Sequence, residues 1–192
     1  LARKKVKHLY LGIESGLDDV LKFMKKDHDL AQAYQAIDRL HEAGLIYDAH
    51  IMTGVAGKGR GMENAEALAQ FLNRTNPAHV VNFSMFLHKE VPLYQDIRQG
   101  TFVPADELET IREEYHLIER IAPEKAGANI LYDGFHDFIH VRVRGHLPGD
   151  KEKMLAKLNG IIQEYEGKEP VYSFVQGECP DLEYCDDGKA VW

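Results

Sequence analysis

Short apolar stretches alternate with amphipathic stretches along the first two thirds of the chain. Each apolar stretch has the length of a buried strand, and the predicted strands are 6–13, 45–53 and 79–87. Apolar residues then recur at every third or fourth position, which predicts helices at 17–24, 29–44, 64–73 and 106–121. Strands that alternate with helices are joined by right-handed crossovers and run parallel. This order suits a doubly wound sheet or part of a (β/α) barrel.

The pattern changes beyond residue 122. The elements predicted there are extended segments at 129–132 and 138–144, a turn at Asp133-Gly134, a helix at 150–165 and a last strand at 171–175. An acidic, irregular tail begins at Gln176. We therefore predict two regions, a half barrel at 1–122 and an α+β extension with the tail at 123–192.

Side chains alternate along a strand, so each of the three strands offers two sets of residues. The apolar sets, which we predict to face the covering helices, are Leu9, Leu11 and Ile13, then Ala49, Ile51 and Thr53, then Val81, Phe83, Met85 and Leu87. The mixed sets are His8, Tyr10, Gly12 and Glu14, then Asp48, His50, Met52 and Gly54, then Asn82, Ser84, Phe86 and His88. Such a polar face is predicted to line a lumen that holds water or a ligand.

Glu14 ends the first strand with a carboxylate. It lies at the carboxyl end of its strand, where the active sites of barrels are built. The alternative is a helix N-terminal carboxylate favoured by the helix dipole, with Ser15 as the cap of the next helix. The position of Glu14 in the polar set favours ligand binding.

The loop GVAGKGRG after the second strand invites a phosphate-binding interpretation. It does not fit the P-loop, because Gly59 follows Lys58, and it does not fit GxGxxG. Two interpretations remain: a flexible loop that offers Lys58 and Arg60 to a carboxylate, or a solvated turn with two surface cations.

Composition narrows the function classes. The 192 residues are 44% hydrophobic and 28% charged, as in a globular protein, and the net charge of −8 opposes a nucleic-acid surface. No apolar run reaches membrane-spanning length, so no membrane partner is expected. The two cysteines, Cys179 and Cys185, fit a reducing, cytoplasmic location. The chain begins at Leu1 without a methionine, so we expect a piece of a longer polypeptide.

Three motifs occur in an order that matches a known superfamily. GIESGLDDVLKFMKKDH resembles the fourth-strand segment of radical S-adenosylmethionine (radical SAM) enzymes, where a strand ends in G-[IV]-[EQ]-S-G. HIMTGVAGKGRGMENA is similar to their fifth strand and its turn, and NFSMFLHKEVPLY to their sixth. The group most resembled is akin to oxygen-independent coproporphyrinogen oxidase, and the match covers about residues 6–120.

The resemblance implies the C-terminal half of a partial (β/α)6 barrel whose mouth holds S-adenosylmethionine against a 4Fe–4S cluster. It implies that Glu14, with Ser15 beside it, binds the ribose hydroxyls. It further implies that Met52 and Gly54 pack against adenine and that Phe86 offers backbone to the adenine edge. The substrate would meet the residues that remain at the barrel mouth, which are Lys58, Arg60, Ser84 and His88.

One motif of the family is absent. CxxxCxxC does not occur, and three thiolates are needed to hold the cluster. We therefore expect that this chain cannot hold the cluster alone and has the N-terminal half of its own polypeptide as partner. A half barrel leaves its first strand unpaired, which predicts a homodimer through that edge, testable by light scattering.

Other side chains support weaker interpretations. His136 and His140 are predicted to be surface histidines rather than zinc ligands, and the glutamates of 106–121 a solvated helix face. Arg142 and Arg144 are either ligands of a substrate carboxylate or packing residues on an exterior strand. Two alternatives to a radical enzyme stay open: an independent half-barrel module for binding or assembly, and a metal-independent barrel enzyme such as an aldolase or isomerase.

Overall fold

The computed structural model describes residues 4–174. The strands are β1 (His8–Glu14), β2 (Ile46–Thr53), β3 (His79–Ser84), β4 (Ile130–His136) and β5 (Val141–Leu147). The helices are α1 (Asp18–Phe23), α2 (Leu30–Glu42), α3 (Gly61–Thr75), α4 (Leu93–Arg98), α5 (Glu107–Arg120), the short 3-10 helix η2 (Asp137–Ile139) and α6 (Lys151–Tyr165).

The strands form one sheet in the order β1-β2-β3-β4-β5. The pairs β1–β2, β2–β3 and β3–β4 are parallel, and β5 is antiparallel to β4. The predicted α/β class and the parallel arrangement of the first three strands are confirmed. The fold is that of a five-stranded, mostly parallel sheet with helices, compatible with part of a TIM-like barrel.

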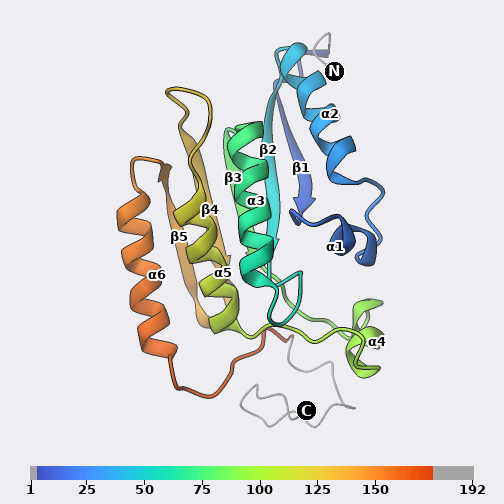
Figure 1. Cartoon of the computed structure of the whole chain (residues 1–192), viewed down its shortest axis with the longest axis vertical. Helices are drawn as coiled ribbons and strands as arrows, with labels where there is room; N and C mark the ends of the chain where they lie inside the picture. Colours follow the sequence, from blue (N-terminus) through green and yellow to red (C-terminus); the bar gives the residue numbers. More distant parts are fainter. Residues whose placement is uncertain (1–3, 175–192) are drawn as a thin grey trace.

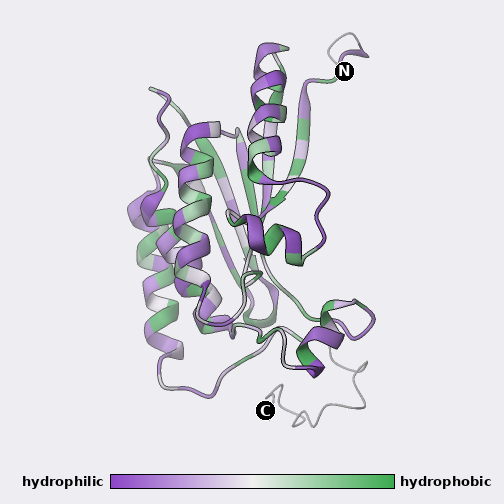
Figure 2. Cartoon of the chain, turned by 45° about the vertical axis from the view of Figure 1, so that its right-hand side comes forward, coloured by the Kyte–Doolittle hydropathy of each residue, from purple (hydrophilic) through white to green (hydrophobic). Residues whose placement is uncertain are grey.

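Helices α2, α3, α5 and α6 all lie over the same face of the sheet (Figure 1). The main apolar core lies between these helices and the strands, and its most buried members include Ile37, Ala49, Leu68, Ile118 and Ile130. The covering helices carry both hydrophilic and hydrophobic positions along their length (Figure 2), as an amphipathic layer requires. No described helix covers the opposite face of the sheet, which is called the open face below. Tyr10, in the middle of β1, is 55% exposed there.

The sequence prediction placed a turn at Asp133-Gly134, and this is wrong. β4 runs through both residues, and the reversal to β5 is made by η2 and His140, whose φ is +53°. Gly134 is needed inside the strand because the Glu114 carboxylate lies 1.8 Å from where a Cβ would be. Glycine therefore marks a close approach of α5 here rather than a turn.

The region after residue 122 contributes to the same sheet as the region before it. β4 pairs in parallel with β3, so the parallel part of the sheet extends to a fourth strand. Of the predicted last strand, Phe174 forms an isolated bridge with Leu87. Val175 and the acidic tail with both cysteines lie outside the described residues.

A second apolar cluster lies beyond the carboxyl ends of β2 and β3. It joins α1, the loop after β2, α4 and the segment that ends at Phe174, through Val20, Val55, Ala56, Met85, Leu87, Tyr94, Ile97, Phe102 and Phe174. This cluster fixes the loops around the carboxyl ends of the strands, where parallel sheets carry their ligand sites.

Candidate functional site

The turn after β1 holds Glu14 in an unusual backbone conformation. Its φ is +64°, a left-handed value that a residue with a Cβ rarely adopts. The strand register shifts at this point, between Gly12 and Glu14. A left-handed backbone at a residue with a side chain is strained, so contacts with the surrounding structure must hold Glu14 in this conformation.

The Glu14 side chain lies over the open face of the sheet. Its Oε1 is 2.6 Å from the position of a Cβ on Gly12, and Gly12 pairs with His50 on that face. Lys26 Nζ donates a hydrogen bond of 3.1 Å to the same oxygen. The Glu14 side chain is 25% exposed, so the carboxylate is held by one cation and is accessible from the open face. This is the placement that the sequence predicted for a ligand-binding acid.

Ser15 does not cap α1 as predicted. The N-cap position belongs to Leu17, which makes no side-chain capping bond. Ser15 is fully buried, and its hydroxyl accepts from the Leu17 N–H and donates to Asn64 Oδ1 at 2.7 Å. Ser15 therefore connects the turn after β1 to helix α3.

The turn after β2 is connected to α3 as well, through Glu113 of α5. The Gly54 N–H donates to Glu113 Oε2 at 2.8 Å, and Asn64 Nδ2 donates to Glu113 Oε1 at 2.7 Å. Burial raises the pKa of Glu113 to about 8, although the bonds from Asn64 and Gly54 act in the opposite direction. A buried chain of hydrogen bonds thus runs from Ser15 through Asn64 and Glu113 to Gly54.

A cavity of about 290 Å³ opens beside the turn after β2, which contributes Val55 to its wall. Its walls are mainly apolar, and they include Met52, Met85, Phe86 and the chain at Lys25. Small-molecule sites occupy roughly 300–1,000 Å³, so this cavity is at the lower end of that range. Two of the predicted adenine contacts, Met52 and Phe86, line it together. Phe86 is 55% exposed.

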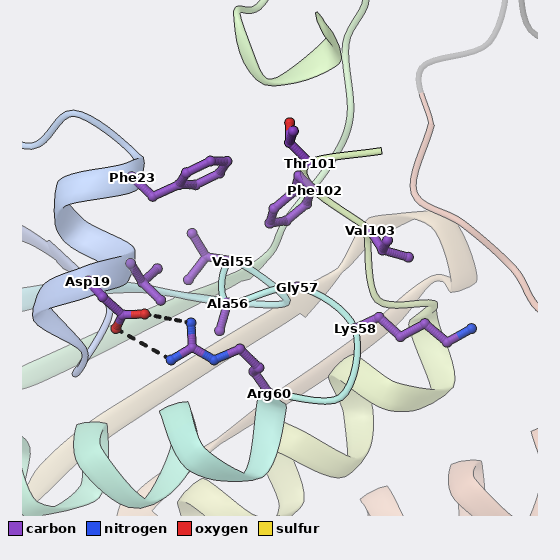
Figure 3. A pocket seen from close by; sticks show the side chains of 11 residues that line it. Asp19, Phe23, Val55, Ala56, Gly57, Lys58, Arg60, Thr101, Phe102 and Val103 are labelled. Carbon is purple, nitrogen blue, oxygen red and sulfur yellow. Dashed lines mark hydrogen bonds and ion pairs between the residues drawn. The ribbon is translucent and has the colours of Figure 1, made fainter. Parts of the chain in front are cut away.

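The glycine loop lines a second cavity of about 430 Å³ (Figure 3). Arg60 does not point freely into it, because its guanidinium binds Asp19 at 2.7 Å and Glu63 at 2.9 Å. These two carboxylates raise the pKa of Arg60 above its ordinary value, chiefly through the Glu63 hydrogen bond. The Lys58 side chain extends away from the cavity in Figure 3. The rings of Phe23 and Phe102 stack 5.7 Å apart at its rim.

The prediction that Asn82 and Ser84 face a lumen is wrong. Asn82 pairs with Ile51 on the helix side of the sheet, and Asn82 Nδ2 donates to Glu114 Oε1 at 3.0 Å. The Ser84 hydroxyl donates to Glu107 Oε1 at 3.0 Å. The predicted substrate contact Ser84 is therefore buried beneath α5, whereas His88 lies in the segment after β3.

The glutamates of α5 are not a solvated face. Glu107, Glu113 and Glu114 are buried, and so is His136, which the sequence prediction placed at the surface. His136 Nδ1 lies 3.1 Å from Glu107 Oε2, and Nε2 lies 3.0 Å from Glu114 Oε2. Burial alone would lower the pKa of His136, but the charge of Glu114 and the bonds to both carboxylates raise it to about 10. An imidazolium, which donates from both nitrogens, therefore lies between two carboxylates.

Ring side chains form a row across the open face. Tyr10 and His50 have ring centroids 5.1 Å apart, His50 and Phe83 6.1 Å, and Phe83 and Phe135 5.3 Å. The Arg142 guanidinium lies 4.6 Å from the Phe135 centroid. The row thus crosses all five strands. The sequence prediction had assigned Phe83 to the helix side, and this too is wrong.

Arg142 is fixed on the open face by a second contact. Asp133 accepts from its Nε at 2.8 Å and from its Nη2 at 2.7 Å, in a bidentate pair. This hydrogen bonding keeps the pKa of Asp133 below its ordinary value. Asp133 also lies 3.7 Å from Arg144. Both predicted arginines are therefore on the open face, held by one carboxylate.

Residues 4–174 contain no group of three or more His, Cys, Asp or Glu side chains arranged to hold a metal ion. Within the same range, no helix combines the length and the hydropathy that a bilayer-spanning segment needs.

Comparisons with known proteins give a structural match and no sequence match. No family model and no curated protein sequence matches the chain. The fold is similar to that of Elp3 from the archaeon Methanocaldococcus infernus, lacking its N-terminal residues 1–46, with a TM-score of 0.59 and 19% identity. The match covers 82% of this chain but only 36% of Elp3. At this identity the match shows a shared fold.

Proposed function

We propose that this chain is the C-terminal part of the barrel of a radical SAM iron–sulfur oxidoreductase and supplies the ribose and adenine side of the S-adenosylmethionine site. The observation that carries the proposal is the Glu14 carboxylate, turned onto the open face at the carboxyl end of β1. The Elp3-like fold and the order of the three motifs support it.

The site residues fit a nucleoside. A carboxylate accepts two hydroxyl hydrogen bonds, so Glu14 would hold the ribose of S-adenosylmethionine. Met52 and Phe86 line one apolar cavity and would enclose the adenine, with the turn at Gly54 beside them. Arg60 is already bound by two carboxylates and Ser84 by Glu107, so these two are the weaker of the four proposed substrate contacts.

The chain does not fit the 4Fe–4S cluster. It has two cysteines where three thiolates are required, and both lie outside the described residues. We propose that the N-terminal half of the same polypeptide supplies the cluster motif and pairs with the free edge of β1. Without that half, a second copy of the chain would pair there.

A second candidate is an independent binding or assembly module on the same half barrel. The row of ring side chains on the open face, half-buried except for the exposed Tyr10, favours it, because such a surface can receive another protein. The residues encoded upstream of Leu1 distinguish the two. A CxxxCxxC motif there supports the enzyme, and its absence supports the module.

Titration calorimetry of S-adenosylmethionine tests the proposal in the polypeptide that includes the upstream half. Hydrogen bonds to a charged group contribute roughly 1.5–3 kcal/mol each, so Glu14→Ala should weaken binding by about 10- to 100-fold for each bond that it removes. Glu42→Ala, an exposed change at the end of α2, is the matched control and should bind like wild type. Equal affinities for Glu14→Ala and wild type would remove Glu14 from the site.

A further inference from the structure

Two turns of the proposed site are joined by a single buried path of hydrogen bonds. We propose that Asn64 and Glu113 are positioning residues that hold the turns after β1 and β2 as one unit, so that both sets of ligand contacts are placed together. The identity of the ligand rests on the proposed function. The coupling between the turns rests on the bonds described next.

Asn64 lies at the centre of the path. Its Oδ1 accepts from the Ser15 hydroxyl at 2.7 Å and from the Gly16 N–H at 3.1 Å. Its Nδ2 donates to Glu113 Oε1 at 2.7 Å, and Glu113 Oε2 accepts from the Gly54 N–H at 2.8 Å. Asn64 thus receives two donors on its oxygen and faces an acceptor with its nitrogen. These partners fix the orientation of the amide.

Water cannot replace these bonds. Ser15 and Asn64 are completely buried, and Glu113 is 1% exposed. A buried donor or acceptor that loses its partner keeps the full desolvation cost, so the loss of one bond disturbs its neighbours along the path. Motion of either turn therefore requires Asn64 or Glu113 to move.

The turn after β1 has a backbone conformation that needs such support. Glu14, directly before Ser15, has φ +64°, whereas the φ of +83° at Gly54 is one that glycine adopts readily. A left-handed conformation at a residue with a side chain persists only where neighbouring contacts maintain it. The Ser15 and Gly16 bonds to Asn64 supply those contacts next to the ligand-binding carboxylate.

The polarity of the path gives a direct experiment. Asn64→Asp would replace the amide donor that faces Glu113 by a carboxyl oxygen, so the two acids would have to share a proton. Glu113→Gln would place an amide NH₂ against another donor, either Asn64 Nδ2 or the Gly54 N–H, whichever way the new amide is turned. The double change exchanges amide and carboxylate and restores every donor–acceptor pair. The new carboxylate on α3 would accept from Ser15, Gly16 and the new amide on α5, and the carbonyl of that amide would accept from Gly54. A double-mutant cycle then isolates the coupling.

Two measurements apply to all four proteins. Hydrogen exchange of the Gly16 and Gly54 amides in this chain should lose at least about 10-fold protection at both positions in each single variant and recover in the double variant. The affinity for S-adenosylmethionine, measured in the longer polypeptide, should follow the same order. If a single variant does not fold, a double variant that folds counts as the expected recovery.

Asn73→Asp is the control for stability alone. Asn73 joins the same two helices at their other end, donating to the Arg120 carbonyl at 3.1 Å and accepting from the Ala122 N–H at 2.7 Å. This variant should lose stability without loss of S-adenosylmethionine affinity or of local protection at Gly16 and Gly54.

Three results would overturn the positioning role. One is exchange that loosens at Gly16 alone in Asn64→Asp and at Gly54 alone in Glu113→Gln. Another is a double variant that stays as impaired as the single variants or does not fold. The third is an equal loss of affinity in Asn73→Asp. If the amides respond as expected but the wild-type longer polypeptide binds no S-adenosylmethionine, the proposed function fails and the coupling between the turns stands.

Discussion

The two glycines that flank Glu14 in GIESG are required for different physical reasons. A Cβ on Gly16 would lie 2.4 Å from the Leu68 backbone nitrogen and 2.5 Å from the Ala67 carbonyl carbon, so this glycine lets the turn pack on α3. A Cβ on Gly12 would meet the ends of two flexible side chains, Glu14 and Lys26. One glycine therefore serves the fold, and the other leaves room for the candidate ligand-binding carboxylate.

Alanine substitutions should separate these roles. Gly16→Ala should lower the free energy of unfolding by about 3 kcal/mol or more, because backbone atoms of α3 cannot move aside. Gly12→Ala should change it by less than about 1 kcal/mol, since flexible side chains can move aside, but should weaken S-adenosylmethionine binding by displacing Glu14. Urea denaturation and calorimetry measure the two effects.

A third glycine provides the control for this pair. Gly160 lies inside α6, with nothing near the position of a Cβ. Gly160→Ala should therefore raise the free energy of unfolding by roughly 0.5–1 kcal/mol. A Gly16→Ala variant as stable as wild type would contradict the close packing of this turn against α3.

At residue scale, the sequence predicts positions better than faces. The sequence was sufficient to predict that the first strand ends at Glu14, because strand length and the following Ser15-Gly16 fix where the strand stops. Asn82 and Ser84 were assigned to the wrong side, because their polarity was taken as exposure. Their partners lie on α5, well beyond β3 in the chain, and no local pattern indicates such partners.

At the scale of single elements, the spacing of acidic and apolar residues in helix α5 held a signal for buried carboxylates. Glu107 and Glu114 are seven residues apart, and Ile111 and Ile118 lie four residues after each of them, so all four share one helix face. Acidic residues in register with an apolar stripe could have indicated buried carboxylates. The partner that makes their burial tolerable, His136, comes from β4 and could not be assigned without the fold.

Removal of that partner should strongly destabilise the sheet–helix contact. His136→Ala leaves the Glu107 and Glu114 oxygens buried without their cation, and breaking a buried ion pair costs about 3–5 kcal/mol. The free energy of unfolding at pH 7 should fall by that amount. His146→Ala, at an exposed position of β5, should change it by less than about 0.5 kcal/mol. Similar small losses in both variants would contradict an imidazolium held between the two carboxylates.

At the scale of the whole molecule, two buried groups make stability depend on pH in one direction. The pKa of Glu113 rises from 4.5 to about 8, and that of His136 from 6.5 to about 10. Both groups bind protons more tightly in the folded chain than in the unfolded chain. Their contributions are complete below pH 4.5 and 6.5, and they are lost as pH rises through 8 and 10.

The free energy of unfolding should therefore decrease between about pH 5 and pH 9, by on the order of several kcal/mol, most steeply between about 6.5 and 8. Asp19 and Asp133, whose pKa values are lowered by Arg60 and Arg142, act in the opposite sense only in the acid range. Urea denaturation at each pH measures the curve. In Glu113→Gln the part between 4.5 and about 8 should disappear, and stability that rises toward alkaline pH would contradict the account.

The sequence also predicted the class of the whole fold but not its extent. The alternation of apolar strand segments with amphipathic helix segments identified the first three parallel strands, because both patterns can be recognised within a short stretch of sequence. The fourth parallel strand was predicted too short, as 129–132, because Asp133 and Gly134 have turn chemistry. The contact that makes them strand residues comes from α5. The row of rings on the open face was missed because it needs the register of all five strands.

A crystal structure of the polypeptide with the proposed upstream half and bound S-adenosylmethionine would show directly whether Glu14 binds the ribose. A parallel strand should pair with the free edge of β1, and the ribose hydroxyls should lie within hydrogen-bond distance of the Glu14 carboxylate. Adenine should occupy the cavity lined by Met52 and Phe86. A nucleoside bound elsewhere, with Glu14 still paired only to Lys26, would contradict the account.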